Sequence, residues 1–251
     1  MASDGGTGWV KILVISDHEE KQLYEFFDPN RWVGKVDLVI SCGDLAASYL
    51  SYLVTVLRVP LLYVAGNHDG RYTMFPPEGC DNIDGKLVRV GGLLIAGLAG
   101  CYRYSAAQDG LQFSALGIGR RVRRLGLAVW RAGGLDVMVS HAAPLRCPFT
   151  PRLCPKPAGL GLPCIHPEIP GHPVICPEAT DPCHRGVGAY TRAIGRWKPR
   201  FWLHGHNHIE YGRVPRLWWI GPTQVVNGDG HVVLDLGIPP DLERGSMAPR
   251  L

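Results

Sequence analysis

Side chains able to bind metal or transfer protons follow five apolar runs of the sequence, where each run ends. The blocks are Asp17-His18-Glu19, Gly43-Asp44, Gly66-Asn67-His68-Asp69, Ser140-His141 and His204-Gly205-His206-Asn207-His208. Imidazole and carboxylate groups suit Mn, Fe, Ni or Zn, and a carboxylate can bridge two ions about 3.5–4 Å apart. Two such ions polarise a phosphoryl oxygen and activate a shared water. The blocks therefore fit a pair of divalent metal ions.

Apolar runs with the composition of buried strands would position these blocks. They cover residues 10–16, 36–43, 59–66, 92–100, 135–141 and 199–206, and helical spacing is found at 20–33, 45–58 and 113–132. Buried strands that alternate with helices predict an α/β protein whose sheet is covered on both faces. Ligands of such sheets bind beyond the carboxyl ends of the strands, so we expect the polar blocks to meet at one edge.

The C-terminal half contains two further features. Asn227-Gly228-Asp229-Gly230 separates two alternating runs and predicts a hairpin. The segment 144–182 is rich in Pro and Cys, which favours an insertion or lid over the site. Its cysteines match no common zinc spacing, so free thiols are favoured over a zinc site or a disulfide. We expect one domain over residues 1–237 and a frayed tail at 238–251.

Composition and missing motifs exclude several classes of protein. A net charge of +4 is too mild to indicate a nucleic-acid partner. No apolar stretch reaches the roughly 18 residues of a membrane span. The first residues, MASDGGTGW, lack a basic and an apolar signal region, so we expect a cytoplasmic location. Neither a Walker-type phosphate loop nor a Gly-x-Ser-x-Gly elbow is present.

In this order, over about residues 10–212, the five blocks resemble the signature of the calcineurin-like metallophosphoesterases. The resemblance implies a four-layer α-β-β-α sandwich. It also implies hydrolysis of a phosphomonoester or phosphodiester by a water or hydroxide that bridges two metal ions. The ligands that it implies are Asp17, residue 19 and His208 for the first ion, Asp44 as the bridge, and Asn67, His141 and His206 for the second. His68 would face the substrate and protonate the leaving oxygen, and Asp69 would orient His68.

The first block departs from the family pattern, which is Asp-x-His. Either Glu19 replaces the usual His as a ligand, or the backbone shifts so that His18 takes its place. Side chains alternate along an extended chain, which puts residues 17 and 19 on one side and favours Glu19. An added carboxylate favours Mn or Fe over Zn, with Zn and Ni as alternatives.

The substrate is expected to be a small phosphorylated molecule, with nucleotides as one candidate class. His184 and Arg185 precede a helix-like run at 187–197, whose N-terminus would favour an anion. Tyr102 and Arg103, with Tyr104, are candidates for stacking on a base. The alternative function is a catalytically silent, metal-bound scaffold for a protein partner, but the full set of ligands together with His68 favours an enzyme. The sequence predicts no oligomeric state.

Overall fold

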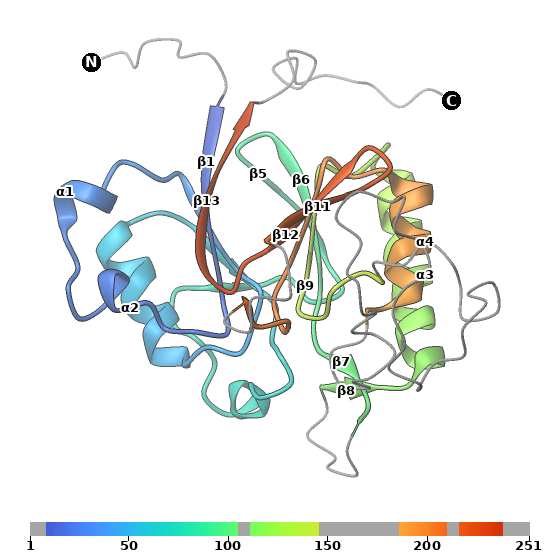
Figure 1. Cartoon of the computed structure of the whole chain (residues 1–251), viewed down its shortest axis with the longest axis horizontal. Coiled ribbons are helices and arrows are strands. Elements are labelled where there is room, and N and C mark those ends of the chain that lie inside the picture. The colour runs from blue at the N-terminus through green and yellow to red at the C-terminus, as the bar shows by residue number, and fades with distance from the viewer. Residues whose placement is uncertain (1–8, 105–110, 146–185, 210–215, 238–251) are drawn as a thin grey trace.

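The computed structural model describes residues 9–104, 111–145, 186–209 and 216–237, and it contains two sheets packed face to face (Figure 1). The first sheet has the strand order β13 (Gly230–Gly237), β1 (Trp9–Ser16), β2 (Leu38–Ser41), β3 (Leu61–Tyr63) and β4 (Asp81–Asn82). The second has the order β11 (Leu217–Ile220), β12 (Thr223–Asn227), β10 (Phe201–His204), β9 (Val137–Ser140), β6 (Leu93–Leu98) and β5 (Leu87–Val90). A short ribbon pairs β7 (Cys101–Tyr102) with β8 (Gln112–Phe113).

Helices cover the outer faces of both sheets. Figure 1 shows α1 (Pro29–Trp32) and α2 (Ala47–Leu57) beside the first sheet, and α3 (Ala115–Arg131) and α4 (Gly188–Trp197) beside the second. Two short 3-10 turns, Lys21–Leu23 and Gly70–Thr73, lie in the connections of the first half. The layers are therefore α-β-β-α, which confirms the predicted sandwich.

Alternation along β1 shows why a nearly continuous apolar run suits this architecture. Ile12 and Val14 pack between the two sheets, whereas Leu13 and Ile15 pack outward, in the core that α2 covers. Because both faces of the strand are buried, every position in this stretch must be apolar. A third apolar cluster packs α3 and α4 onto the second sheet.

Two predictions about local structure are wrong. The helix expected over 20–33 is broken into the turn Lys21–Leu23 and the short helix α1, which begins at Pro29 after Asp28 caps it. The hairpin expected around Asn227-Gly228-Asp229-Gly230 is also wrong, because β12 and β13 lie in different sheets. These residues carry the chain from one sheet to the other, and β13 pairs antiparallel with β1 along its whole length.

The Pro- and Cys-rich segment falls almost entirely outside the described residues, which stop at 145 and resume at 186. The two flanks meet: the N–H of Val187 donates to the carbonyl of Ala143 at 2.8 Å, and Pro144 and Val187 form a β-bridge. The domain limits, the lid and the tail at 238–251 stay predictions. Within the described ranges, no helix has the length and apolar character needed to cross a bilayer.

Candidate metal centre

The predicted blocks come together because both sheets present strand ends on the same side. β1, β2 and β3 run parallel in the first sheet, and β6, β9 and β10 run parallel in the second. The loops of the two sheets are directly bonded. Between the sheets, both carboxylate oxygens of Asp17 accept from the N–H of His206, at 3.0 and 3.1 Å. Within the first sheet, the N–H of Asp17 donates to the carbonyl of Gly43 at 3.1 Å.

Strained backbone marks this edge. Among the described residues, five non-glycine positions have a positive φ, and three of these are the predicted ligands Asp17 (64°), Asp44 (57°) and His206 (67°). Such conformations are uncommon for side chains other than glycine and cluster at functional sites. Close packing adds to the constraint, because a Cβ on Gly66 would overlap the carboxylate of Asp44. The fold thus holds these side chains in positions that relaxed loops would not adopt.

Asp44, Asn67 and His141 form a group of converging donor atoms. Nε2 of His141 lies 3.3 Å from Oδ2 of Asp44 and 2.9 Å from Oδ1 of Asn67. The Nδ1 of His141 lies 2.8 Å from the carbonyl of Cys42, so Nδ1 carries the proton and Nε2 is the atom left for a ligand. A carboxylate oxygen, an amide oxygen and an imidazole nitrogen make up a donor set for a divalent cation.

Two further residues complete this group. The amide of Asn67 donates to the hydroxyl of Tyr104 at 2.9 Å, which fixes the amide so that its oxygen faces His141. The ring of His206 lies 4.8 Å from that of His141, between centroids. Potential ligand atoms of Asp44, His141 and His206 all lie within 4.8 Å of one another. The structure therefore assembles the four residues implied for the bridge and the second ion.

The charges of this group are strongly coupled. Burial by itself lowers the pKa of His141, but the facing carboxylate of Asp44 raises it to about 9. Burial opposes ionisation of Asp44, yet His141 and the backbone N–H of His68 lower the pKa of Asp44 to about 2. Burial also raises the pKa of Asp17, against the attraction of His141. A positive charge is thus favoured beside Asp44, where the second ion is expected.

The two predicted catalytic residues have different surroundings. His68 is exposed, and its backbone N–H donates to Oδ1 of Asp44 at 2.8 Å. Asp69 is buried, and its Oδ2 accepts from the N–H groups of Asp44 (2.8 Å) and Gly66 (2.7 Å). Within the described part of the chain, the hydrogen bonds of the Asp69 carboxylate run to backbone and not to the imidazole of His68. Asp69 therefore joins the loops after β2 and β3.

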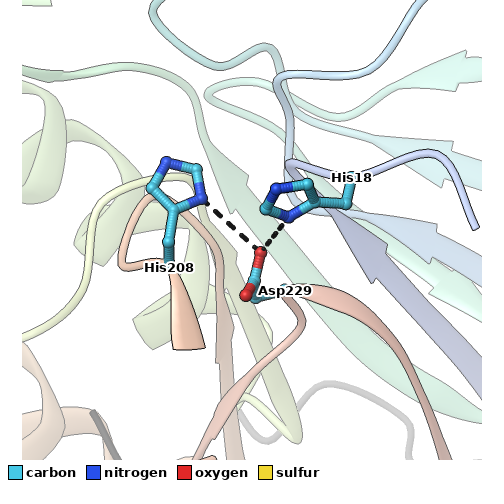
Figure 2. A group of neighbouring side chains, drawn as sticks. All are labelled: His18, His208 and Asp229. Carbon is cyan, nitrogen blue, oxygen red and sulfur yellow. Dashed lines mark hydrogen bonds and ion pairs between the residues drawn. The ribbon is translucent and has the colours of Figure 1, made fainter. Parts of the chain in front are cut away.

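A second group contains His208, His18 and Asp229 (Figure 2). Nδ1 of His18 lies 2.7 Å from Oδ1 of Asp229, and Nδ1 of His208 lies 3.6 Å from the same oxygen. Glu19 is exposed, and its carboxylate accepts from the N–H of Ala46 at 3.2 Å. The structure thus brings His18, rather than Glu19, to His208.

Asp229 was missed by sequence reasoning. The sequence does place this acidic residue between two alternating runs, but the Asn-Gly-Asp-Gly pattern around it favours a hairpin turn and not a ligand.

The substrate-binding candidates are only partly placed. His184 and Arg185 lie outside the described residues. Tyr102 packs against the outer core beneath α3 and α4, and Arg103 is exposed, with its N–H bonded to the carbonyl of Phe113. Tyr104, the neighbouring residue, contacts a predicted ligand, because its hydroxyl accepts from the amide of Asn67.

Comparisons with known proteins support the fold. No protein-family model matches the chain, and no curated protein matches it. The protein TT1561 of Thermus thermophilus aligns with a TM-score of 0.52 at 14% identity, covering 88% of this chain and 89% of TT1561. Another solved chain aligns with a TM-score of 0.55 at 14% identity, covering 90% of this chain and 95% of its own. The phosphopantetheinyl hydrolase PptH of Mycobacterium tuberculosis aligns with a TM-score of 0.41 at 15% identity, covering 89% of this chain and 90% of PptH. The fold of this chain is therefore similar to that of TT1561 and of the second solved chain, the two alignments with a TM-score above 0.5. The four layers described above are those that the resemblance to the calcineurin-like metallophosphoesterases implied.

Proposed function

We propose that this protein is a metal-dependent phosphoesterase that hydrolyses a phosphomonoester or phosphodiester at a two-ion centre. The observation that carries the proposal is the convergence of Asp44, Asn67 and His141 through three atoms that are all metal donors. These atoms come from three different strand ends of two sheets, and Asp44 is held there in a left-handed backbone conformation.

The residues present fit divalent ions. Asp44, Asn67, His141 and His206 would hold one ion, with Asp44 shared with a second ion on the side of Asp17 and His208. When bound, the ions would polarise a phosphoryl oxygen and lower the pKa of a water between them. Two neutral imidazoles, an amide and a carboxylate leave positive charge in the centre, which suits an anionic phosphate ester.

His68 is placed to act on the substrate side of this centre. Its backbone N–H is fixed on the carboxylate of Asp44, and its imidazole is exposed. The residue therefore stands next to the predicted ligand Asn67 and is open to solvent. We propose that the imidazolium of His68 stabilises charge on the phosphoryl group and donates a proton to the leaving oxygen.

A hydrolysis screen tests the function. The metal-stripped protein is reloaded with Mn, Fe, Zn or Ni and assayed with an aryl phosphomonoester, a bis-aryl phosphodiester and cyclic nucleotides. His68→Ala should bind metal as the wild type does and lose about 10²–10⁴-fold in kcat. Asp44→Asn should lose both metal and activity.

The screen also separates the enzyme from the alternative scaffold. Wild-type protein that binds metal but hydrolyses none of these esters would contradict the proposed function and favour a scaffold for a protein partner. A His68→Ala variant with wild-type kcat would contradict the role given to His68.

A further inference from the structure

We propose that His18, His208 and Asp229 bind one divalent cation, with His18 and Asp229 taking the place expected for Glu19. This inference deepens the proposed function, on which it rests, because this cation would be one of the two ions of the centre. The proposal concerns which residues bind the ion, and it can be tested without an activity measurement.

The three side chains come from distant parts of the sequence. His18 follows β1, His208 follows β10, and Asp229 lies between β12 and β13 (Figure 2). Their potential ligand atoms all lie within 4.8 Å of one another, and two imidazole nitrogens face a single oxygen, Oδ1 of Asp229. Ligands about 2.0–2.2 Å from a tetrahedral ion lie roughly 3.3–3.6 Å apart, so the observed 2.7 and 3.6 Å separations require only small shifts.

Asp229 is anchored more firmly than an ordinary turn residue. Its side chain is 5% exposed, and its other oxygen, Oδ2, accepts from the N–H of Ile209 at 2.7 Å. Its own N–H donates to Oδ1 of Asn227 at 3.0 Å, and its carbonyl accepts from Arg216 at 3.1 Å. A carboxylate this buried is costly without a positively charged or donating partner, and a cation would provide one. His18 and His208, at 40% and 33% exposure, leave access from solvent.

The backbone explains why His18 and not Glu19 reaches this position. Asp17 has a φ of 64°, and the N–H of His18 donates to the carbonyl of Ser16 at 2.6 Å, across a three-residue turn. Side-chain alternation holds only for extended backbone, and the turn ends the extended strand before residue 19. His18 therefore points toward Asp229, while Glu19 caps the N–H of Ala46.

The ligand set also changes the expected metal. With His18 and Asp229 in the place of Glu19, the ligands of this ion include one more imidazole and the same number of carboxylates. Such sets suit Zn, Fe and Ni at least as well as Mn. We therefore expect Zn to compete effectively with Mn at this site.

The test is a count of bound ions. Metal-stripped wild type and variants are loaded with Mn or Zn, passed through a desalting column and analysed by elemental mass spectrometry, and titration calorimetry gives the Kd values. His18→Ala and Asp229→Asn should each lose one ion per chain, or bind it at least about 100-fold more weakly. Glu19→Gln changes the competing candidate ligand, and Glu25→Gln changes an exposed residue as a control. Both variants should keep the number of bound ions found in the wild type. His18 is partly exposed, so its variant should fold even if Asp229→Asn does not, and circular dichroism checks this.

The outcomes are separable from those of the hydrolysis screen. The ligand assignment would be overturned if His18→Ala and Asp229→Asn both bind metal as the wild type does, or if Glu19→Gln loses an ion instead. Either result would count even if the enzyme hydrolyses phosphate esters. Loss of an ion in His18→Ala supports the assignment even if no ester is hydrolysed. If the wild type binds a single ion, its loss in His18→Ala supports the assignment and its retention overturns it. A wild type that binds no ion overturns it as well.

Discussion

Replacement of Asp69 by Ala should destabilise the metal-free protein strongly. The side chain accepts from the N–H groups of Asp44 and Gly66, which lie 2.8 and 2.7 Å from the same oxygen. A buried donor left without a partner costs about 1–3 kcal/mol, so two cost about 2–6 kcal/mol. That is a large share of the roughly 5–15 kcal/mol that holds a typical domain together.

Asp69→Asn is the matched control, because its carbonyl oxygen can accept both N–H groups. Burial raises the pKa of Asp69 to about 6, although the N–H of Gly66 acts in the opposite direction. The folded state therefore binds this proton more tightly than the unfolded state does. The stabilisation that the proton gives is complete below about pH 4 and is lost as the pH rises through 6. As the pH rises from about 4 to above 6, the wild type loses this stabilisation and the Asn variant, which does not titrate, does not. The Asn variant should therefore become more stable relative to the wild type as the pH rises.

Urea unfolding in the presence of EDTA, followed by tryptophan fluorescence at about pH 4.5 and about pH 7, measures both effects. At the higher pH, Asp69→Asn should lie within about 1.5 kcal/mol of wild type, and Asp69→Ala well below it. Two results would refute the role of Asp69 in holding the two loops together. One is an equal loss of unfolding free energy in the two variants, and the other is a loss of less than about 1 kcal/mol in Asp69→Ala.

Two further predictions concern metal binding. Because the pKa of His141 is raised to about 9, a cation that binds Nε2 must displace a proton at neutral pH. The affinity for Mn should therefore rise by up to tenfold per pH unit between about pH 6 and 8, and calorimetry should detect the release of about one proton. An affinity for Mn that does not depend on pH would contradict this. Gly66→Ala would push a Cβ into the neighbouring carboxylate and should weaken Mn binding at least about tenfold. Gly119→Ala, whose added Cβ meets no atom within 4 Å, is the control and should bind Mn as the wild type does.

Much of the candidate metal centre could be predicted from local sequence. Asp44, Asn67 and His141 each follow an apolar run that forms a buried strand, and parallel strands of one sheet end on the same side. Once the order of the blocks indicated the sandwich, the meeting of these residues followed. The pKa shifts of His141 and Asp44 could not be anticipated, because they depend on the 3.3 Å separation of the two groups and on their burial.

The group around His208 shows where local reasoning fails. Alternation favoured Glu19 over His18, but it assumes an extended backbone, and the positive φ of Asp17 breaks that assumption. The turn at Asp17 is itself imposed from elsewhere, since its carboxylate is held by the N–H of His206 and its own N–H by the carbonyl of Gly43. Neither contact is visible within the block that contains Asp17.

By itself, the sequence determined the buried strands and the edge at which the polar blocks meet, because each depends on the type and period of nearby residues. The α-β-β-α layers were implied by the resemblance of the five blocks to the calcineurin-like metallophosphoesterases. The tertiary structure alone decided that β13 pairs with β1 rather than with β12. That pairing brings Asp229 to His18, 211 positions away in the chain. The physical reason is that a strand's choice of sheet depends on which edge and which core can accept it, and these are formed by residues far away in the sequence.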